Sequence, residues 1–561
     1  MSFANIALNA ENAKSTIFIV VIFAYIFDPY PLFAFLGLAK IIGYIFPLLL
    51  SICYICVPLV RFPFFAPVKC RLIHNQTINL MSNYKETGSK AYLYGICAVA
   101  VIGGLLFGYD TAVISGAEQA LQKFFASGLG DFYTTGLHGF VTSSALIGCI
   151  IGGLISGIMA TRLGRRNALI FASVLFFLSA LGSYMPEFLF RPNFEFFQPG
   201  EATKSLMWAF ILYRILGGIG VGMASAICPM YIAEVAPAQI RGTLVSCNQF
   251  AIIFGQLVVY AINTLIRSGL ADTPELIQAA MINIGWRKMF VSEAFPAGAF
   301  GLLLLLVPKT PRYLVMRGNT QKAMEVLTRI NGEGRAQEIL QEIKETLVEK
   351  KESLFSYGIL VIIVGVLLSF FQQAVGINVV LYYAPRIFQN MGSSGDAAMI
   401  QTVVMGVVNI LFTVVAILTV DKWGRRPLLI VGSIGMAIGM IALSILSFCN
   451  VIGIAALVFI IIYTASFMMS WGPICWVLIS EIFPNTIRGN AVAIAVAAQW
   501  ISNYVISSTF PSLCEWSIGG TYLIYAGFSI LSALFVLKLV PETKGKTLEE
   551  MSALWRSKMK K

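Results

Sequence analysis

Two ionisable side chains lie deep inside apolar segments, where an unpaired charge is costly. Asp110 stands in the run GGLLFGYDTAVISG, and Arg214 stands in YRILGGIGVG. A charge inside a bilayer costs several kcal/mol, so each residue is a functional candidate. A neighbouring guanidinium favours the ionised carboxyl, whereas burial disfavours it. A carboxyl held between these two effects can bind and release a proton, which makes the pair a candidate proton-coupling site. The alternative is a permanent buried salt bridge.

A second set of polar residues interrupts apolar segments without adding charge. Its members are amides and aromatic residues: Gln249, Gln256, Gln372, Gln373, Asn378, Tyr382, Asn409, Trp476, Gln499 and Trp500. Amides both donate and accept hydrogen bonds, and aromatic faces suit the C–H face of a sugar ring. The pattern favours a cavity for a neutral polyhydroxylated ligand. The alternative is hydrogen bonding between helices, which amides commonly provide in membranes.

A third set of charged residues occurs in duplicated blocks. PMYIAEVAPAQIRG returns as WVLISEIFPNTIRG, RLGRR returns as DKWGRR, and VPKTPR returns as VPETKGK. The charged members are Arg162, Arg165, Arg166, Glu234, Arg241, Arg425, Arg426, Glu481 and Arg488. We predict that these arginines and glutamates pair into a cytoplasmic latch that stabilises one conformation. Orientation of the chain by positive charge alone is the alternative.

Three blocks repeated in one order indicate two related halves, and composition places them in lipid. The chain is 58% hydrophobic and 12% charged, against about 25% charged residues in soluble domains. Its apolar runs are long and continuous, which favours spanning helices over a barrel. Duplicated halves in such a chain are typical of a transporter that binds its substrate where the halves meet.

The elements that must position these residues are twelve apolar segments. We expect spans near 91–116, 137–158, 167–185, 206–228, 244–267, 287–308, 355–390, 400–420, 427–448, 452–478, 490–512 and 520–540. The predicted fold is an all-α membrane protein with two pseudo-symmetric six-helix halves, at 81–308 and 355–540. Residues 309–354 are expected to form short intracellular helices between the halves, and residues 541–561 a cytoplasmic tail.

The net charge of +12 reflects orientation rather than nucleic-acid binding. Basic residues cluster in short connections, which places those connections and both ends of the twelve-helix unit in the cytoplasm. The connections 117–136 and 186–205 carry few cations and are predicted to be external. The two histidines, His74 and His138, have no metal-ligand spacing. Because no nucleophile–base set or phosphate loop appears either, we expect no metal, no cofactor and no enzyme activity.

Residues 1–80 do not fit this plan. They hold further apolar stretches near 16–38 and 42–61, and they match a signal peptide poorly. The segment is either a membrane appendage or upstream sequence joined to a gene whose natural start is Met81. We favour the second interpretation.

The motifs resemble those of the sugar porter family of the major facilitator superfamily over about residues 90–553. They are GRR twice, the Glu-to-Arg-Gly blocks twice, VPKTPR, QQAVGIN and VPETKGKTLEE. Within the family, NQFAIIFGQ, QQAVGINVVLYYAP, MSWGPICWVLISEIFPN and IAVAAQW are most similar to bacterial D-xylose–proton symporters. The resemblance implies a major facilitator fold, a bacterial inner (plasma) membrane location and a monomer with a sugar substrate.

The resemblance also implies roles for individual residues. It implies a proton site at Asp110 with Arg214, and a carboxylate that modulates proton handling at Glu293. The implied sugar contacts are Gln249, Gln372, Gln373, Asn378, Trp476 and Gln499, and the implied cavity lining is Phe107, Gln256, Tyr382, Asn409 and Trp500. Facilitative relatives carry a neutral residue at the position of Asp110, so its presence favours proton coupling.

Two positions depart from the family pattern. Thr161 stands where many members have Asp, and Lys309 stands where Glu is usual, which puts the energetics of the latch in doubt. The expected function is import of a monosaccharide, D-xylose in the first place, with a proton by alternating access. The alternatives are an uncoupled facilitator for glucose or a related hexose, and a transporter-like sugar sensor.

Overall fold

The computed structural model describes residues 88–189, 200–237, 240–348, 353–449, 454–484, 486–544 and 548–559. All of them belong to one unit of the chain, Pro67–Lys561. Within these ranges the regular structure is helical, and 12 helical segments are long and apolar enough to cross a membrane. The predicted fold class is therefore confirmed. The prediction for residues 1–80 lies outside the described residues.

The first half contains the spans that precede the charged linker. They are α4 (Lys90–Leu129), α5 (Thr135–Arg162), α6 (Arg165–Tyr184), α7 (Lys204–Val235), α8 (Arg241–Ser268) and a sixth span built from α9 (Pro274–Ala280), the π-turn η3 (Met281–Gly285), α10 (Trp286–Val291) and α11 (Ala294–Leu306). Two short 3₁₀ turns, η1 (Gly130–Phe132) and η2 (Pro186–Leu189), follow α4 and α6.

The second half repeats this plan with more breaks. It consists of α15 (Ile359–Ala374), α16 (Ile377–Tyr382), α17 (Ala384–Asn390), α18 (Gly395–Trp423), α19 (Arg425–Phe448), α20 (Ile454–Met468), α21 (Trp471–Ile482), α22 (Arg488–Trp516) and α23 (Ile518–Leu539). Between the halves lie α12 (Pro311–Met316), α13 (Thr320–Asn331) and α14 (Glu333–Val348), and α24 (Leu548–Met559) ends the described chain.

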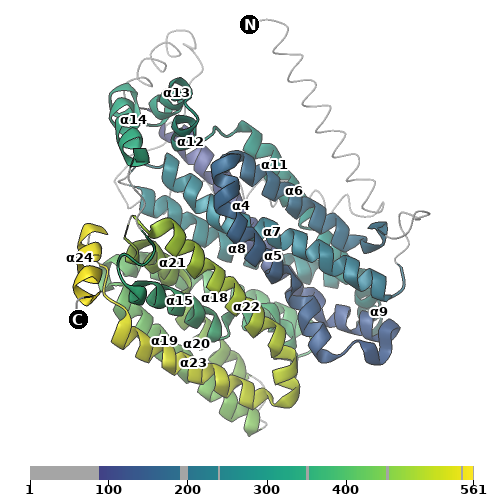
Figure 1. The fold of residues 1–561 in the computed structure, drawn as a ribbon. Coiled ribbons are helices and arrows are strands. Elements are labelled where there is room, and N and C mark those ends of the chain that lie inside the picture. The colour runs from purple at the N-terminus through teal and green to yellow at the C-terminus, as the bar shows by residue number, and fades with distance from the viewer. Residues whose placement is uncertain are drawn as a thin grey trace, which may run out of the picture. The chain divides into compact units, whose positions relative to one another are not determined.

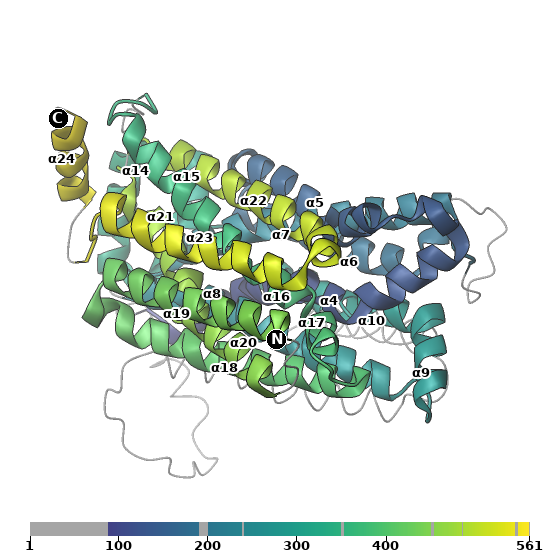
Figure 2. The ribbon, with the colours of Figure 1, turned by 90° about the horizontal axis from the view of Figure 1, so that it is seen from below.

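The two halves pack their helices in matching pairs. In the first half α4 packs on α8 and α6 on α11; in the second, α15 packs on α22 and α19 on α23. Figure 1 shows the purple-to-teal half beside the green-to-yellow half, and α5 against α22 and α8 against α18 join them. Figures 1 and 2 both place α14 and α24 at one end of the bundle and α9 at the other. We call the first the basic end, because the duplicated arginine blocks lie there, and the second the far end.

Small residues let α5 and α7 approach closely. A Cβ built on Gly148 would lie 2.0 Å from the carbonyl oxygen of Ile215, and one on Gly218 would lie 1.8 Å from that of Ala145. No side chain fits at such contacts. Close backbone approach of this kind is typical of helix packing in membranes, where the hydrophobic effect does not drive association between helices.

The seventh and tenth spans are broken where the sequence weakens a helix. Gly376 has φ 90°, in the left-handed region, and separates α15 from α16. The freed carbonyl of Val375 accepts a hydrogen bond of 2.8 Å from the Tyr463 hydroxyl. The second break precedes Pro473, where Gln372 donates to the carbonyls of Trp471 and Gly472 at 3.2 and 3.3 Å. Broken backbone at membrane depth is thus satisfied by protein groups, as lipid requires.

The first span is longer than predicted. We expected it to end near residue 116, with a connection at 117–136, but α4 continues to Leu129. The segment AEQALQKFF contains strong helix formers, and Leu121, Phe124 and Phe125 fall at helical spacing and are buried. This buried stripe stabilises the extra turns. It also brings Glu118 into the packed interior.

Candidate functional site

Asp110 and Arg214 meet in the interior of the first half. The Asp110 side chain is 0% exposed, and its Oδ1 accepts a hydrogen bond of 2.6 Å from Arg214. A second guanidinium nitrogen donates to the Asp110 carbonyl oxygen at 3.2 Å. The Phe290 ring covers the guanidinium, with its centroid 4.9 Å from Cζ. The pair expected from two isolated charges is therefore present, and Asp110 Oδ2 accepts no hydrogen bond from the described residues.

Glu293 adds a second carboxyl to this pair. It is 1% exposed and lies within interaction range of both Asp110 and Arg214. It occupies the kink between α10 and α11, a short stretch after the π-turn η3; such turns are frequent at functional sites. Two carboxyls share one guanidinium here, so their fully ionised state carries a net negative charge. Binding of one proton makes the cluster neutral, which suits a buried site.

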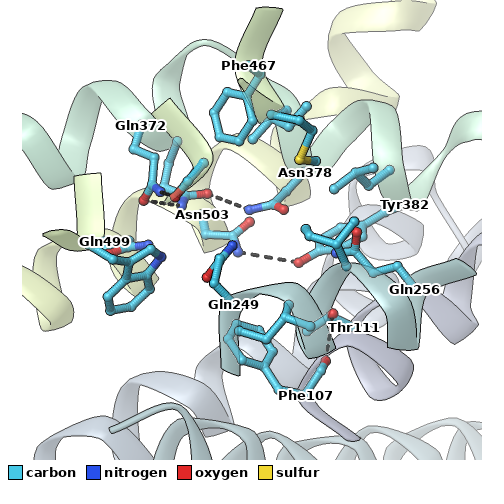
Figure 3. A pocket seen from close by; sticks show the side chains of 18 of the residues that line it. Phe107, Thr111, Gln249, Gln256, Gln372, Asn378, Tyr382, Phe467, Gln499 and Asn503 are labelled. Carbon is cyan, nitrogen blue, oxygen red and sulfur yellow. Dashed lines mark hydrogen bonds between the residues drawn. The ribbon is translucent and has the colours of Figure 1, made fainter. Parts of the chain in front are cut away.

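A polar cavity lies between the two halves. Ten of the eleven predicted binding residues line it: Phe107, Gln249, Gln256, Gln372, Gln373, Asn378, Tyr382, Trp476, Gln499 and Trp500. Figure 3 shows amides from both halves directed into the same space. Asn409 is not among the lining residues. It is 1% exposed, and within the described part of the chain its amide nitrogen and oxygen make no hydrogen bond.

Several lining residues were not predicted. Thr111, Phe467 and Asn503 border the cavity. Asn503 follows Gln499 by one helical turn, so the pair forms a polar strip on one face of α22. That spacing is the signal that could have identified Asn503. Thr111 and Phe467 carry no such signal, because single Thr and Phe residues are ordinary in spanning helices.

The amides of the cavity bond to one another in this structure. Asn378 donates to Gln373 at 2.5 Å, and Asn503 donates to the Tyr382 hydroxyl at 3.4 Å (Figure 3). Phe107 and Trp500 lie across the halves with ring centroids 5.5 Å apart. The cavity therefore offers amides, a phenol and aromatic faces. A hydroxyl-rich ligand can exchange its own hydrogen bonds for those now made between protein groups.

Helix α4 links the charge pair to the cavity. Phe107 and Thr111 line the cavity, while Asp110, on a different face of the same turn, contacts Arg214 of α7. From the other half, Tyr382 lies within electrostatic range of both charges. A shift of α4 relative to α16 thus alters both the cavity and the surroundings of Asp110.

At the basic end, the predicted arginine–glutamate contacts form within each half. Arg165 pairs with Glu234 at 2.7 Å, and Arg425 pairs with Glu481 at 3.0 Å. Each pair connects the start of one helix to the end of another in the same half. That these pairs hold the basic end in one conformation stays a prediction.

The other duplicated arginines donate to backbone carbonyls at helix ends. Arg166 donates to Val307 and Arg426 to Leu537, while Arg241 donates to Ala236 and Arg488 to Phe483. Cations at a helix C-terminus satisfy free carbonyls and complement the helix dipole. Arg162 instead supplies a carbonyl, which accepts from Arg317 at 2.5 Å. Equivalent arginines of the duplicated blocks therefore also cap helix C-termini in both halves.

Contacts between the halves extend from the cavity to the far end. Tyr260 of α8 donates to the Leu381 carbonyl at 3.1 Å, and Arg267 pairs with Asp396 at 2.8 Å. The α4 residue Glu118 meets Arg386 of α17 at 2.9 Å. Sequence reasoning missed the Glu118 contact, because it joins residues that are remote in the chain. These contacts close the far end in this conformation.

Comparison with known proteins places this chain among transporters. A family model described as "Sugar (and other) transporter" matches residues 96–555. The chain is 50% identical over 491 residues to a D-xylose-proton symporter of Escherichia coli K12, covering 84% of this chain and 98% of that protein. It is 39% identical over 482 residues to a glucose facilitated diffusion protein of Zymomonas mobilis, with coverage of 84% and 98%.

A solved structure agrees with this likeness. It is the E. coli xylose transporter in a partially occluded, inward-open conformation, which is 50% identical and superposes with a TM-score of 0.73. The match covers 82% of this chain and 100% of that one. At this level of identity the likeness extends beyond general architecture to the sequence of the chain.

Proposed function

This chain belongs to the sugar porter family of the major facilitator superfamily, and we propose that it imports D-xylose together with a proton by alternating access. The observation that carries the proposal is the buried Asp110–Arg214 pair. It lies on a different face of α4 from the face that lines the amide-rich cavity. The uncharged cavity can bind a neutral sugar, and the buried carboxyl of the pair can bind a proton. The proton is the coupling ion, and no prosthetic group and no enzymatic step is involved.

The proposed coupling depends on the Asp110–Arg214 ion pair in the first half. With Asp110 ionised, Arg214 holds it and the cluster favours one conformation. Protonation weakens that ion pair and frees α4 to move with the sugar-bearing cavity. Sugar and proton are coupled because each binds the two conformations with different affinity. The closed far end supports an inward-facing state for this conformation, as does the likeness to a transporter solved in a partially occluded, inward-open conformation.

We further propose that the protein is a monomer in a bacterial inner membrane, with the basic end and both ends of the twelve-helix unit in the cytoplasm. Arginine-rich connections at that end support this orientation. The basic end would then open to the cytoplasm when the far end is closed. This matches release of sugar and proton inside the cell.

Uptake of labelled xylose and glucose into proteoliposomes tests the proposal. With the outside acidic, xylose should accumulate above its external concentration, and an uncoupler should abolish accumulation. Glucose should compete for binding, because one hydroxymethyl group is discriminated weakly by an apolar wall. Uptake that never exceeds equilibrium, at a rate independent of the pH gradient, would instead select the uncoupled facilitator suggested by the Zymomonas relative.

A further inference from the structure

A buried carboxylate at the far end lies between partners from the two halves. Glu118 of α4 is 0% exposed. Its Oε2 lies 3.1 Å from Nε2 of His138, which belongs to α5 of the same half. Its Oε1 lies 2.9 Å from Nε of Arg386, which belongs to α17 of the other half. One carboxylate therefore has a partner in its own half and a second partner across the interface.

The partner in the same half is fixed by a further hydrogen bond. His138 is 0% exposed, and its Nδ1 lies 3.0 Å from the Tyr133 hydroxyl. A neutral imidazole with its proton on Nε2 satisfies both contacts, donating to Glu118 and accepting from Tyr133. All three side chains belong to the first half. They form a frame that holds the carboxylate through contacts within the first half.

The partner across the interface is held more loosely. Arg386 is 18% exposed and also donates to Gln122 of α4. Its approach to Glu118 is a close charge contact, and Glu118 Oε1 accepts no hydrogen bond from any residue that the structure describes. Helix α17 follows the broken seventh span directly, beginning right after α16. The guanidinium therefore stands on a short segment of the second half that is not part of the frame.

A cavity lies beside the helical segments that carry this contact. The cavity has a volume of about 250 Å³ and is lined by residues of both halves. Gln119 and Lys123 of α4 and Pro385 and Gln389 of α17 line it, and these residues adjoin Glu118 and Arg386 in sequence. When the halves separate at the far end, this cavity widens and solvates the released carboxylate and guanidinium.

We propose that Glu118, positioned by His138, and Arg386 form a latch that holds the far end closed and so sets the ratio of inward-facing to outward-facing carrier. The inference rests on alternating access as proposed above. It assigns positioning roles and no sugar contact to these residues. Breaking the latch lowers the cost of the outward-facing state, because that state no longer has to give up the ion pair.

The chain contains a matched control for a buried ion pair that does not cross the interface. Arg287 of α10 donates to both oxygens of Glu187 at 2.7 and 3.0 Å, and both side chains are almost fully buried. Both residues belong to the first half. Breaking this pair should destabilise that half, but it should not favour either conformation.

Hydrogen–deuterium exchange of the purified full chain, without sugar, measures the conformational ratio at both ends. Glu118→Gln and Arg386→Gln should each raise exchange in the facing segments of α4 and α17 and lower exchange at the basic end. We expect the outward-to-inward ratio to rise about tenfold, within the usual range for conformational coupling. The double variant should shift the ratio no further than Arg386→Gln alone, because both substitutions remove the same ion pair and only Arg386→Gln also removes the hydrogen bond to Gln122.

Glu187→Gln supplies the comparison, with local exchange rising near η2 and α10 and the basic end unchanged. If Glu118→Gln does not fold, the test depends on Arg386→Gln alone. That variant should fold, because the Arg386 side chain is partly exposed. Unchanged exchange at both ends in folded Arg386→Gln would overturn the latch, as would an equal shift at the basic end from Glu187→Gln. Because hydrogen exchange is measured without transport, a negative result for the latch does not contradict sugar–proton symport. A negative result for symport in proteoliposomes likewise does not contradict the latch.

Discussion

At the scale of single residues, the molecule separates two kinds of polar chemistry by one position on a helix. Thr111 faces an uncharged cavity, whereas Asp110 faces Arg214. The sugar side uses groups that donate and accept without ionising. The proton side confines its charges to a pocket walled by Phe290. Because the two sites share α4, occupancy of one can be sensed at the other without direct contact.

Substitution of Gln249 tests whether the cavity binds sugar. Gln249 lines the cavity from α8 and makes no hydrogen bond to another described residue, so its amide is available to a ligand. Gln249→Ala should raise the xylose KM about fivefold to tenfold, the loss of about 1 kcal/mol of hydrogen bonding. Gln401→Ala is the control, because Gln401 of α18 accepts from Ser393 outside the cavity. An unchanged KM in Gln249→Ala would remove this residue from the sugar site.

The charged and amide residues that the sequence predicted inside the spans share one property: their type is unusual in an apolar run. Asp110, Arg214 and the glutamines could be identified because a charge or an amide in lipid needs a reason. Asn503 was missed although it repeats the pattern of Gln499. The Glu118–Arg386 contact could not be predicted, because only the folded chain brings those segments together. His138 was set aside for lack of metal spacing, yet its role comes from a carboxylate on the neighbouring helix.

At the scale of elements, the two halves differ in how their third helices begin. In the second half, Glu542 accepts hydrogen bonds from the backbone N–H groups of Arg425 and Arg426, and so caps α19. The corresponding position in the first half is Lys309, and no described carboxylate accepts a hydrogen bond from the backbone N–H groups of Arg165 and Arg166. Thr543 also donates to Glu481 at 2.6 Å. The matching atoms of the first half, Thr310 Oγ1 and Glu234 Oε2, are buried and have no hydrogen-bond partner among the described residues. The first half therefore lacks two contacts that the second half makes.

Lys309→Glu should therefore stabilise the protein. A carboxylate at the start of α6 would cap free N–H groups and complement the helix dipole, worth about 1 kcal/mol. The thermal midpoint in detergent should rise by about 2 °C. Lys309→Gln separates the two causes, since it removes the positive charge and adds no anion. A fall in the midpoint of Lys309→Glu would mean that the Tyr313 ring beside Gly164 leaves no room for the cap.

The cap in the second half should also make stability depend on pH. Burial raises the pKa of Glu542, but backbone N–H groups of Lys544, Arg426 and Arg425 outweigh it and hold the pKa below its usual value. The stabilisation is present above the ordinary pKa of Glu and is lost as pH falls through the lowered folded-state pKa. Below about pH 4, wild type should therefore lose thermal stability more steeply than Glu542→Gln. Parallel pH profiles would contradict this.

At the scale of the whole molecule, the closed far end depends on close backbone contact between the halves. A Cβ on Gly139 of α5 would lie 2.1 Å from the carbonyl oxygen of Ser508 in α22. Side chains larger than hydrogen cannot fit there while the far end is shut. Near the other end of α5, a Cβ on Gly157 would meet nothing within 4 Å. Closure of the far end therefore requires a glycine at position 139, whereas position 157 on the same helix has room for a side chain.

Gly139→Leu should hold the carrier open at the far end. We expect external sugar to bind, while uptake and counterflow fall to background because the far end cannot close. Gly157→Leu should transport like wild type. Binding is measured on purified protein and transport in proteoliposomes. Normal transport by Gly139→Leu would show that α5 and α22 separate at this point without being required to close.

The twelve helices, the two halves and the breaks in the seventh and tenth spans could be predicted from apolar runs, repeats and Gly–Pro sites. The extension of α4 to Leu129 could not, because helix formers at 117–129 are equally compatible with a surface connection. The sequence also could not predict which duplicated arginines form ion pairs and which donate to carbonyls, because both roles use the same residue type.

The central claim is that Asp110 carries the coupled proton, and one comparison tests it directly. Xylose counterflow and xylose accumulation driven by a pH gradient are measured in the same proteoliposomes for wild type, Asp110→Asn and the exposed control Asp131→Asn. We predict that Asp110→Asn exchanges xylose but does not accumulate it, while Asp131→Asn does both. Accumulation by Asp110→Asn to the wild-type level would show that the proton is carried elsewhere.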